Sequence, residues 1–312
     1  MVAKHSNARN VLAVVNRKGG VGKTTTAINL AHGLSRKLLR LVDPKDVDQI
    51  QDINNLFQFR DITYYILGHV LLIDFDAQGH CAHGLGVKVD KQDLGDVLLQ
   101  QQHLSEAVIS ADRSEAGFPR PNLWLLPSSD NLETAKEALR AFSTRRVLDE
   151  MGVVTSLPSR DFGLIRVLED QLTLALERFT YIVLDCPPAL DAFSQAVYQF
   201  ADKAIVPVKP DYFSMAGAGQ HINSITEAQL RGINIHVHSI VPTFNVKRHR
   251  LDRQMMDELK QVHGDKVSSP IPRSQAVAEA PAYQQTIFEY DPRYLNPATV
   301  AYQELVDRVY YD

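Results

Sequence analysis

Cysteine and long hydrophobic runs are both scarce in this sequence. Its 312 residues include two cysteines, Cys81 and Cys186, which excludes a fold held together by a set of disulfides and fits a reducing compartment. No apolar stretch approaches the roughly 20 residues that cross a bilayer, and the first residues lack the apolar core of a signal peptide. The sequence therefore predicts a cytoplasmic protein with no membrane association.

An excess of positive charge is also missing. The chain carries 33 Lys and Arg against 37 Asp and Glu, a net charge of −4. This excludes binding of a polyanion by the whole surface, so any contact with nucleic acid must come from a local basic patch. Hydrophobic residues make up 45% of the chain, which is enough to bury a large core at this length.

A glycine-rich stretch, Asn16 to Thr26, follows the apolar run 11–15 and precedes residues 27–34, whose apolar side chains share one helical face. Strand, glycine loop and helix together are the context of a phosphate-binding loop. The backbone N–H groups of such a loop turn inward around phosphate oxygens. Lys23 supplies a cation to the β- and γ-phosphates, and the Thr24 hydroxyl is a ligand for Mg²⁺. The predicted nucleotide contacts in the loop are Lys18, Gly19, Gly20, Val21, Gly22, Lys23, Thr24 and Thr25.

The loop departs from the usual pattern at its start. Arg17 stands where a glycine is expected, and a second lysine, Lys18, follows it. A lysine this early in the loop does not easily reach the γ-phosphate of its own nucleotide, so we expect Lys18 to act on a nucleotide held by a second subunit. The run from Lys18 to Thr25 resembles the deviant Walker A loop of the ParA/MinD family.

Short apolar runs recur along the chain at residues 70–73, 181–184, 204–208 and 235–241. Runs of this kind are typical of strands buried on both faces of a parallel sheet. Helical patterns lie between them, which indicates right-handed βαβ units and a doubly wound, mostly parallel α/β sheet. We expect one P-loop ATPase domain over residues 1–312, with its ligand at the carboxyl ends of the strands.

Carboxylates follow two of these runs. Asp185 resembles a Walker B aspartate, which would hold Mg²⁺ through water or fix the Thr24 side. The segment 74–79 resembles the family's Asp-x-Asp-Pro-Gln-Gly, with Ala77 in place of proline. Since side chains alternate along a strand, Asp74 and Asp76 should point the same way, Asp74 toward the metal and Asp76 toward the attacking water. The predicted metal ligands are Thr24, Asp74 and Asp185, and the predicted catalytic residues are Lys18 and Asp76.

The resemblance covers most of the chain, including 206–213 and a C-terminal signature of ParA/Soj proteins in 278–292. It implies ATP and Mg²⁺ as cofactors, ATP hydrolysis, a homodimer when ATP is bound, and a ParB-like activator. The implied outcome is partition of a plasmid or chromosome region. Resemblance also implies adenine contacts, which are Pro242, Thr243, Pro272 and Arg273.

The densest basic patch is the predicted DNA site, formed by Lys247, Arg248, Arg250 and Arg253. Without interleaved aromatics it should contact phosphates without sequence preference and associate with the nucleoid when ATP is bound. The other interpretation is that these basic residues lie in a loop and at the start of a helix and contact only solvent.

A MinD-like membrane-surface positioning ATPase is the alternative function. MinD docks on lipid through a basic amphipathic C-terminal helix, but the polar side of residues 300–312 is acidic and would be repelled by anionic lipid. We therefore expect a terminal helix that packs on the sheet.

Two segments do not fit the family pattern, at about 39–67 and 149–168. In the first, Val47, Ile50 and Ile53 recur at helical spacing and 62–66 is strand-like. Joining Leu38 directly to Gly68 gives a connection of ordinary length between the helix after the glycine loop and the strand at 70–73. Both segments are interpreted as insertions, either functional elaborations or foreign sequence, which a connection tolerates at small entropic cost.

Overall fold

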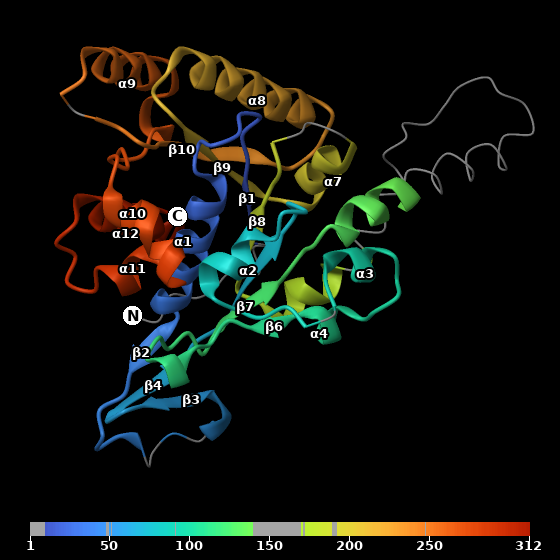
Figure 1. Cartoon of the computed structure of the whole chain (residues 1–312), viewed down its shortest axis with the longest axis vertical. Coiled ribbons are helices and arrows are strands. Elements are labelled where there is room, and N and C mark those ends of the chain that lie inside the picture. Colours follow the sequence, from blue (N-terminus) through green and yellow to red (C-terminus); the bar gives the residue numbers. More distant parts are fainter. Residues whose placement is uncertain are drawn as a thin grey trace, which may run out of the picture.

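A sheet of buried strands forms the centre of the protein (Figure 1). The computed structural model describes residues 10–47, 50, 52–90, 92–139, 170, 172–188, 192–246 and 248–312. Within these residues the sheet has seven strands in the order β10-β9-β1-β8-β5-β7-β6, and every neighbouring pair is parallel except β6 with β7. The strands are β1 (Val11–Val14), β5 (Val70–Asp74), β6 (Ile109–Ser110), β7 (Leu123–Leu126), β8 (Tyr181–Asp185), β9 (Lys203–Val208) and β10 (His236–Pro242). The predicted doubly wound, mostly parallel fold is confirmed.

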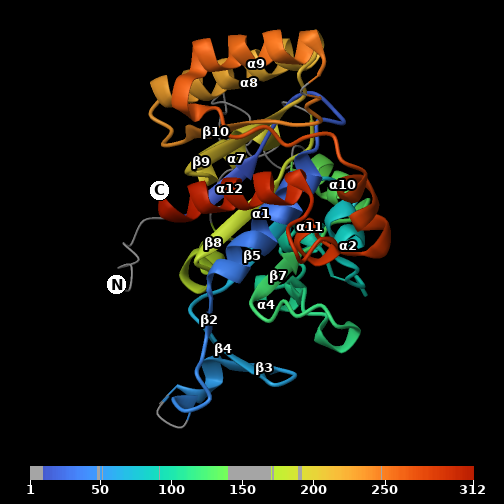
Figure 2. The same ribbon diagram turned by 90° about the vertical axis from the view of Figure 1, so that its left-hand side faces the viewer.

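Helices cover both faces of this sheet (Figures 1 and 2). Alternate side chains of each strand enter opposite layers. Leu12 packs in the layer with α1 and α12, whereas Ala13 packs in the layer with α7 and α8. The longer helices are α1 (Lys23–Lys37), α7 (Ala192–Phe200), α8 (Tyr212–Leu230), α9 (Arg250–His263) and α12 (Pro297–Tyr311). The shorter ones are α2 (His80–Leu85), α3 (Leu94–Leu98), α4 (Leu104–Ala107), α10 (Gln275–Glu279), α11 (Ile287–Tyr290) and the 3₁₀ turns η2 (Ile53–Asn55), η3 (Ser114–Ala116), η4 (Gly264–Lys266) and η5 (Ala280–Tyr283).

The C-terminal helix α12 packs beside α1, in the apolar layer that covers one face of the sheet. A Cβ atom at Gly33 of α1 would overlap Val306 and come within 3.1 Å of Phe288, so the two helices approach closely only because this residue is glycine. The predicted apolar face of α12 is buried, at Tyr302, Val306 and Val309. No described helix combines the length and apolar character that a bilayer crossing requires.

The segment 39–67 forms a second, three-stranded antiparallel sheet in the order β2-β4-β3. Its strands are β2 (Leu39–Leu41), β3 (Leu56–Phe59) and β4 (Ile62–Ile66). It extends away from one end of the body (Figure 2). The strand-like character predicted for 62–66 is confirmed, but the helical spacing around Ile53 is wrong, since this residue opens the short turn η2 and β3 follows. The other insertion, 149–168, lies outside the described residues.

The two ends of the second sheet meet at the surface of the body. The N–H of Leu67 donates to the carbonyl of Leu38 at 2.8 Å. The side-chain amide of Asn122, which is fully buried, donates to the carbonyls of Ser35 and Gly68 at 2.9 Å each. Asn122 thus holds together the two stretches of chain, around Ser35 and Gly68, that lead into and out of the insertion.

Removal of residues 39–67, with Leu38 joined to Gly68, is expected to leave ATP binding unchanged. The phosphate loop precedes the segment, and the two predicted metal-binding carboxylates, Asp74 and Asp185, follow it. The segment also exposes Leu41 and Ile53 at 66% and 70%, so its removal uncovers little new apolar surface. We expect the shortened protein to melt as high as the full chain or higher, by calorimetry. Loss of ATP binding in a shortened protein that remains folded would contradict this.

Candidate active site

The phosphate loop connects β1 to α1, and two of its glycines have left-handed backbone angles. Gly20 and Gly22 have φ of +72° and +87°, a region that glycine occupies without steric cost. Asn16 holds the entrance of the loop, because its side-chain oxygen accepts the N–H of Lys18 at 2.9 Å and its amide donates to the carbonyl of Pro207 at 2.7 Å. Asn16 is fully buried. Sequence reasoning missed this role, for which a polar residue directly after a buried strand was the available signal.

The two lysines of the loop lie in different surroundings. Lys23 is 8% exposed, and its ammonium donates to the carbonyl of Lys18 at 3.2 Å. Burial lowers the pKa of Lys23, and the carboxylates of Asp185 and Asp76 oppose this change. The side chain of Lys18 is exposed. One lysine therefore faces the interior of the site, and the other is available to a second molecule.

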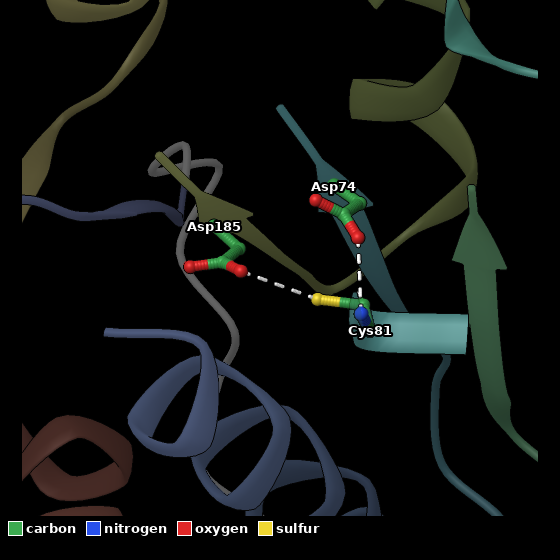
Figure 3. Close-up of side chains that lie close together, drawn as sticks. All are labelled: Asp74, Cys81 and Asp185. Atoms are coloured by element: carbon green, nitrogen blue, oxygen red, sulfur yellow. Dashed lines mark hydrogen bonds between the residues drawn. The ribbon is translucent and has the colours of Figure 1, made fainter. Parts of the chain in front are cut away.

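Asp74 and Asp185 end two adjacent strands and lie opposite each other in the sheet register (Figure 3). Asp74 accepts the backbone N–H groups of Asp76 and Cys81, both at 3.0 Å. Burial raises the pKa of Asp74 to about 6. Burial and the neighbouring Asp74 charge raise the pKa of Asp185 to about 8, and the hydroxyl of Thr24 opposes that rise. Two buried carboxylates held this close favour a nearby cation.

The donor set here fits Mg²⁺. Within the described chain, one carboxylate oxygen of Asp185, Oδ1, is buried without a hydrogen-bond partner. Hydroxyl and carboxylate oxygens are the ligands that Mg²⁺ prefers. Thr24, Asp74 and Asp185 would hold the ion, which neutralises charge on phosphate oxygens when bound.

Asp76 lies in the turn after β5 rather than on the strand. The strand ends at Asp74, so the alternation argument does not extend to Asp76. Its Oδ1 accepts the N–H of Gln78 at 3.1 Å, and its carbonyl accepts the hydroxyl of Ser128. Asp76 is half-buried, and its charge acts on Lys23. The structure thus brings it near the phosphate lysine by turn geometry.

The two segments expected at the adenine lie side by side. Ile271 donates its N–H to the carbonyl of Pro242 at 2.8 Å, and Arg273 donates to that of Asn245 at 3.0 Å. Thr243 ties them to the phosphate loop, since its hydroxyl donates to the carbonyl of Val21 at 2.8 Å. Pro272 lies between Ile271 and Arg273 and bridges to Asn245.

A separate cavity of about 230 Å³ lies beside the loop threonines, between α1, α2 and η5. Its lining does not include the expected adenine contacts. The residues that line it are Thr24, Thr25, Ile28, Asn29, His80, His83, Gly84, Val277, Ala280, Pro281, Gln285 and Ile287.

The basic patch lies at the start of α9. Arg248, Arg250 and Arg253 are exposed, whereas Lys247 lies outside the described residues. The buried Asp252 accepts the N–H of Val246 at 2.7 Å. This bond fixes the start of α9 to the segment that contacts the phosphate loop.

Comparison with known proteins agrees with this geometry. A family profile described as an AAA domain matches residues 9–54 and 67–238. The chain belongs to this family. The match omits residues 55–66, which contain β3 and β4.

Two bacterial proteins are similar over most of the chain. The sporulation initiation inhibitor protein Soj of Bacillus subtilis is 29% identical over 287 residues, 91% of this chain and 92% of its own length. The chromosome partitioning protein ParA of Caulobacter vibrioides is 28% identical over 297 residues, 92% of this chain and 89% of its own. The predicted resemblance to ParA/Soj-type ATPases is confirmed.

A solved structure confirms the fold. The Cyanothece McdA protein in complex with ATP matches with a TM-score of 0.70 at 20% identity, over 97% of this chain and 96% of that chain. The chain therefore has the fold of P-loop proteins of the ParA/MinD family.

Proposed function

We propose that this protein is a Mg-ATP-dependent ATPase that dimerises when ATP is bound and partitions a plasmid or chromosome region. The observation that carries the proposal is the convergence of a buried phosphate lysine, an exposed second lysine and a pair of buried carboxylates at one edge of the sheet. Phosphoryl transfer to water needs positioning and charge stabilisation more than covalent chemistry, and these groups supply both.

Each group has a separate task in the proposed cycle. Lys23 binds the β- and γ-phosphates, while Thr24, Asp74 and Asp185 hold Mg²⁺. Asp76 orients the attacking water. Lys18 completes the site of the second subunit, so hydrolysis requires the dimer. A ParB-like activator stimulates hydrolysis, which separates the subunits.

DNA binding is proposed to follow the nucleotide state. The segment 242–246 contacts the phosphate loop through Thr243 and the start of α9 through Val246. A change at the loop is therefore transmitted to Arg248, Arg250 and Arg253 by a short, hydrogen-bonded path. The proposal is tested by measuring DNA binding and molecular mass with ATP, with ADP and without nucleotide. Binding that is equal in all three states contradicts it.

Replacement of Lys247, Arg248 and Arg250 together by alanine is expected to weaken DNA binding and leave ATP binding unchanged. Each lost phosphate contact removes one released counterion, so the slope of log affinity against log salt should fall by about 0.9 per contact. Fluorescence anisotropy over a salt series measures both quantities.

The matched control removes the same amount of charge from the second sheet, at the other end of the molecule (Figures 1 and 2). Arg40, Lys45 and Arg60 are exposed there, and their replacement by alanine should leave DNA binding unchanged. Equal losses in the two variants would move the DNA site away from α9.

The MinD-like alternative gains no support from α12. Its apolar face is covered by α1 and is not free to enter lipid. Co-sedimentation with anionic vesicles tests this directly, and the expected result is no binding with or without ATP.

A further inference from the structure

The thiol of Cys81 lies between the two buried carboxylates (Figure 3). Its Sγ donates to Asp185 Oδ2 at 3.4 Å. One donor atom each from Asp74, Cys81 and Asp185 lies within 4.8 Å of the others, and all three residues are buried. The phosphoryl-transfer chemistry proposed above gives this thiol no task.

A thiol in this position changes which cations the site selects. Mg²⁺ takes oxygen ligands almost exclusively, whereas Zn²⁺ and other thiophilic cations bind thiolate and carboxylate together. Two ligands on one tetrahedral Zn²⁺, at about 2.3 Å for sulfur and about 2.1 Å for oxygen, are about 3.6 Å apart. The distance from Cys81 Sγ to Asp185 Oδ2 is 3.4 Å, so these atoms are already spaced as ligands of one ion.

A second observation points to a missing ligand. Asp185 is 1% exposed, and its other oxygen, Oδ1, has no hydrogen-bond partner within the described chain. A buried carboxylate oxygen without a partner is costly. This oxygen lies on the side of Asp185 away from Cys81 (Figure 3), so a cation at this cluster would satisfy it by binding both carboxylate oxygens of Asp185.

We propose that Asp74, Cys81 and Asp185 form a binding site for a thiophilic divalent cation of the Zn²⁺ type. The ion binds without nucleotide. The Cys81 thiol loses its proton to solvent as the sulfur–metal bond forms. Because Asp74 and Asp185 are also the proposed Mg²⁺ ligands, an ion held by the thiolate excludes Mg²⁺ and weakens binding of Mg-ATP.

Cys186 provides the matched control. It is also buried and directly follows Asp185, but its thiol faces the carbonyl of Leu184 at 3.8 Å. It does not belong to the donor cluster found among the described residues. Cys81→Ser and Cys186→Ser each remove one buried sulfur, and only the first removes a proposed ligand.

The test is a titration of the nucleotide-free protein with Cd²⁺, which gives an ultraviolet charge-transfer band when a thiolate binds it. We expect one band that saturates at one equivalent in the wild type and in Cys186→Ser, and no band in Cys81→Ser. Competition with a chromophoric chelator then gives Zn²⁺ affinities. Loss of an outer-shell partner alone costs about 10–100-fold, so loss of the Cys81 thiolate should weaken Zn²⁺ binding by at least that factor.

Circular dichroism establishes that each variant is folded. Absence of the band in the wild type, its survival in folded Cys81→Ser, or its loss in Cys186→Ser would overturn the proposal. Zn²⁺-loaded wild type should bind Mg-ATP more weakly than Zn²⁺-treated Cys81→Ser, and equal binding would overturn the exclusion of Mg²⁺. The cation site is tested without nucleotide, so a wild type that binds Cd²⁺ but not ATP would refute the ATPase proposal alone.

Discussion

Replacing Lys23 with alanine is expected to abolish measurable ATP binding. The Lys23 ammonium is the buried cation of the loop, and it faces the carboxylates of Asp185 and Asp76. Hydrogen bonds to charged groups contribute about 1.5–3 kcal/mol each, and this lysine would contact two phosphates. Affinity should therefore fall by about a hundredfold or more in isothermal titration calorimetry.

Lys18→Ala is the matched comparison, since it removes the same charge from the same loop. The Lys18 side chain is exposed, and this residue contacts the loop through its backbone, whose N–H donates to Asn16 and whose carbonyl accepts from Lys23. We expect this variant to retain ATP binding and to lose dimerisation and turnover, measured by light scattering and phosphate release. Equal losses of ATP affinity in the two variants would remove the proposed division of roles.

Replacing Asp76 with alanine is expected to give a protein that binds ATP, dimerises and stays on DNA without hydrolysing ATP. Asp76 is not among the buried carboxylates that would hold Mg²⁺, so nucleotide binding does not depend on it. Correct placement of a base or water contributes about 10²–10⁴-fold to a rate. We expect the turnover rate of Asp76→Ala to be lower than that of the wild type by a factor in this range.

Asp76→Asn separates charge from turn structure. The amide oxygen still accepts the N–H of Gln78, which Asp76 Oδ1 accepts at 3.1 Å, so the melting temperature should match that of the wild type. Turnover should be as low as in Asp76→Ala. Wild-type turnover in either variant would contradict the proposed role of Asp76 in orienting the attacking water.

Local patterns in the sequence predicted the parts of the site that depend on local structure. The glycine loop, the buried strands and the carboxylates at their ends all follow from short runs whose neighbours in the chain fix their conformation. Asn16 and Asn122 could not be predicted in this way. Each acts on a backbone group that is distant in sequence, such as Pro207 for Asn16 and Ser35 for Asn122.

The incorrect predictions also have physical causes. Apolar residues about three positions apart in 47–57 imitate a helix, but this spacing also arises where a turn runs into a strand. The prediction that Asp76 points the same way as Asp74 required the strand to continue to Asp76, but the strand ends at Asp74. The strands β6 and β7 were missed because no functional motif marks their ends. The adenine contacts and the DNA contacts at α9 stay predictions.

The order of strands in the sheet has a consequence during synthesis on the ribosome. β8 lies between β1 and β5 in space although it follows both in the chain. A nascent chain that stops before β8 therefore contains the phosphate loop and Asp74 but lacks the strand that joins them in register. Pairings so distant in sequence form late in folding. In the proposed function, ATP and its metal would thus stabilise only the chain that has inserted β8, and a truncated translation product would gain nothing from the nucleotide.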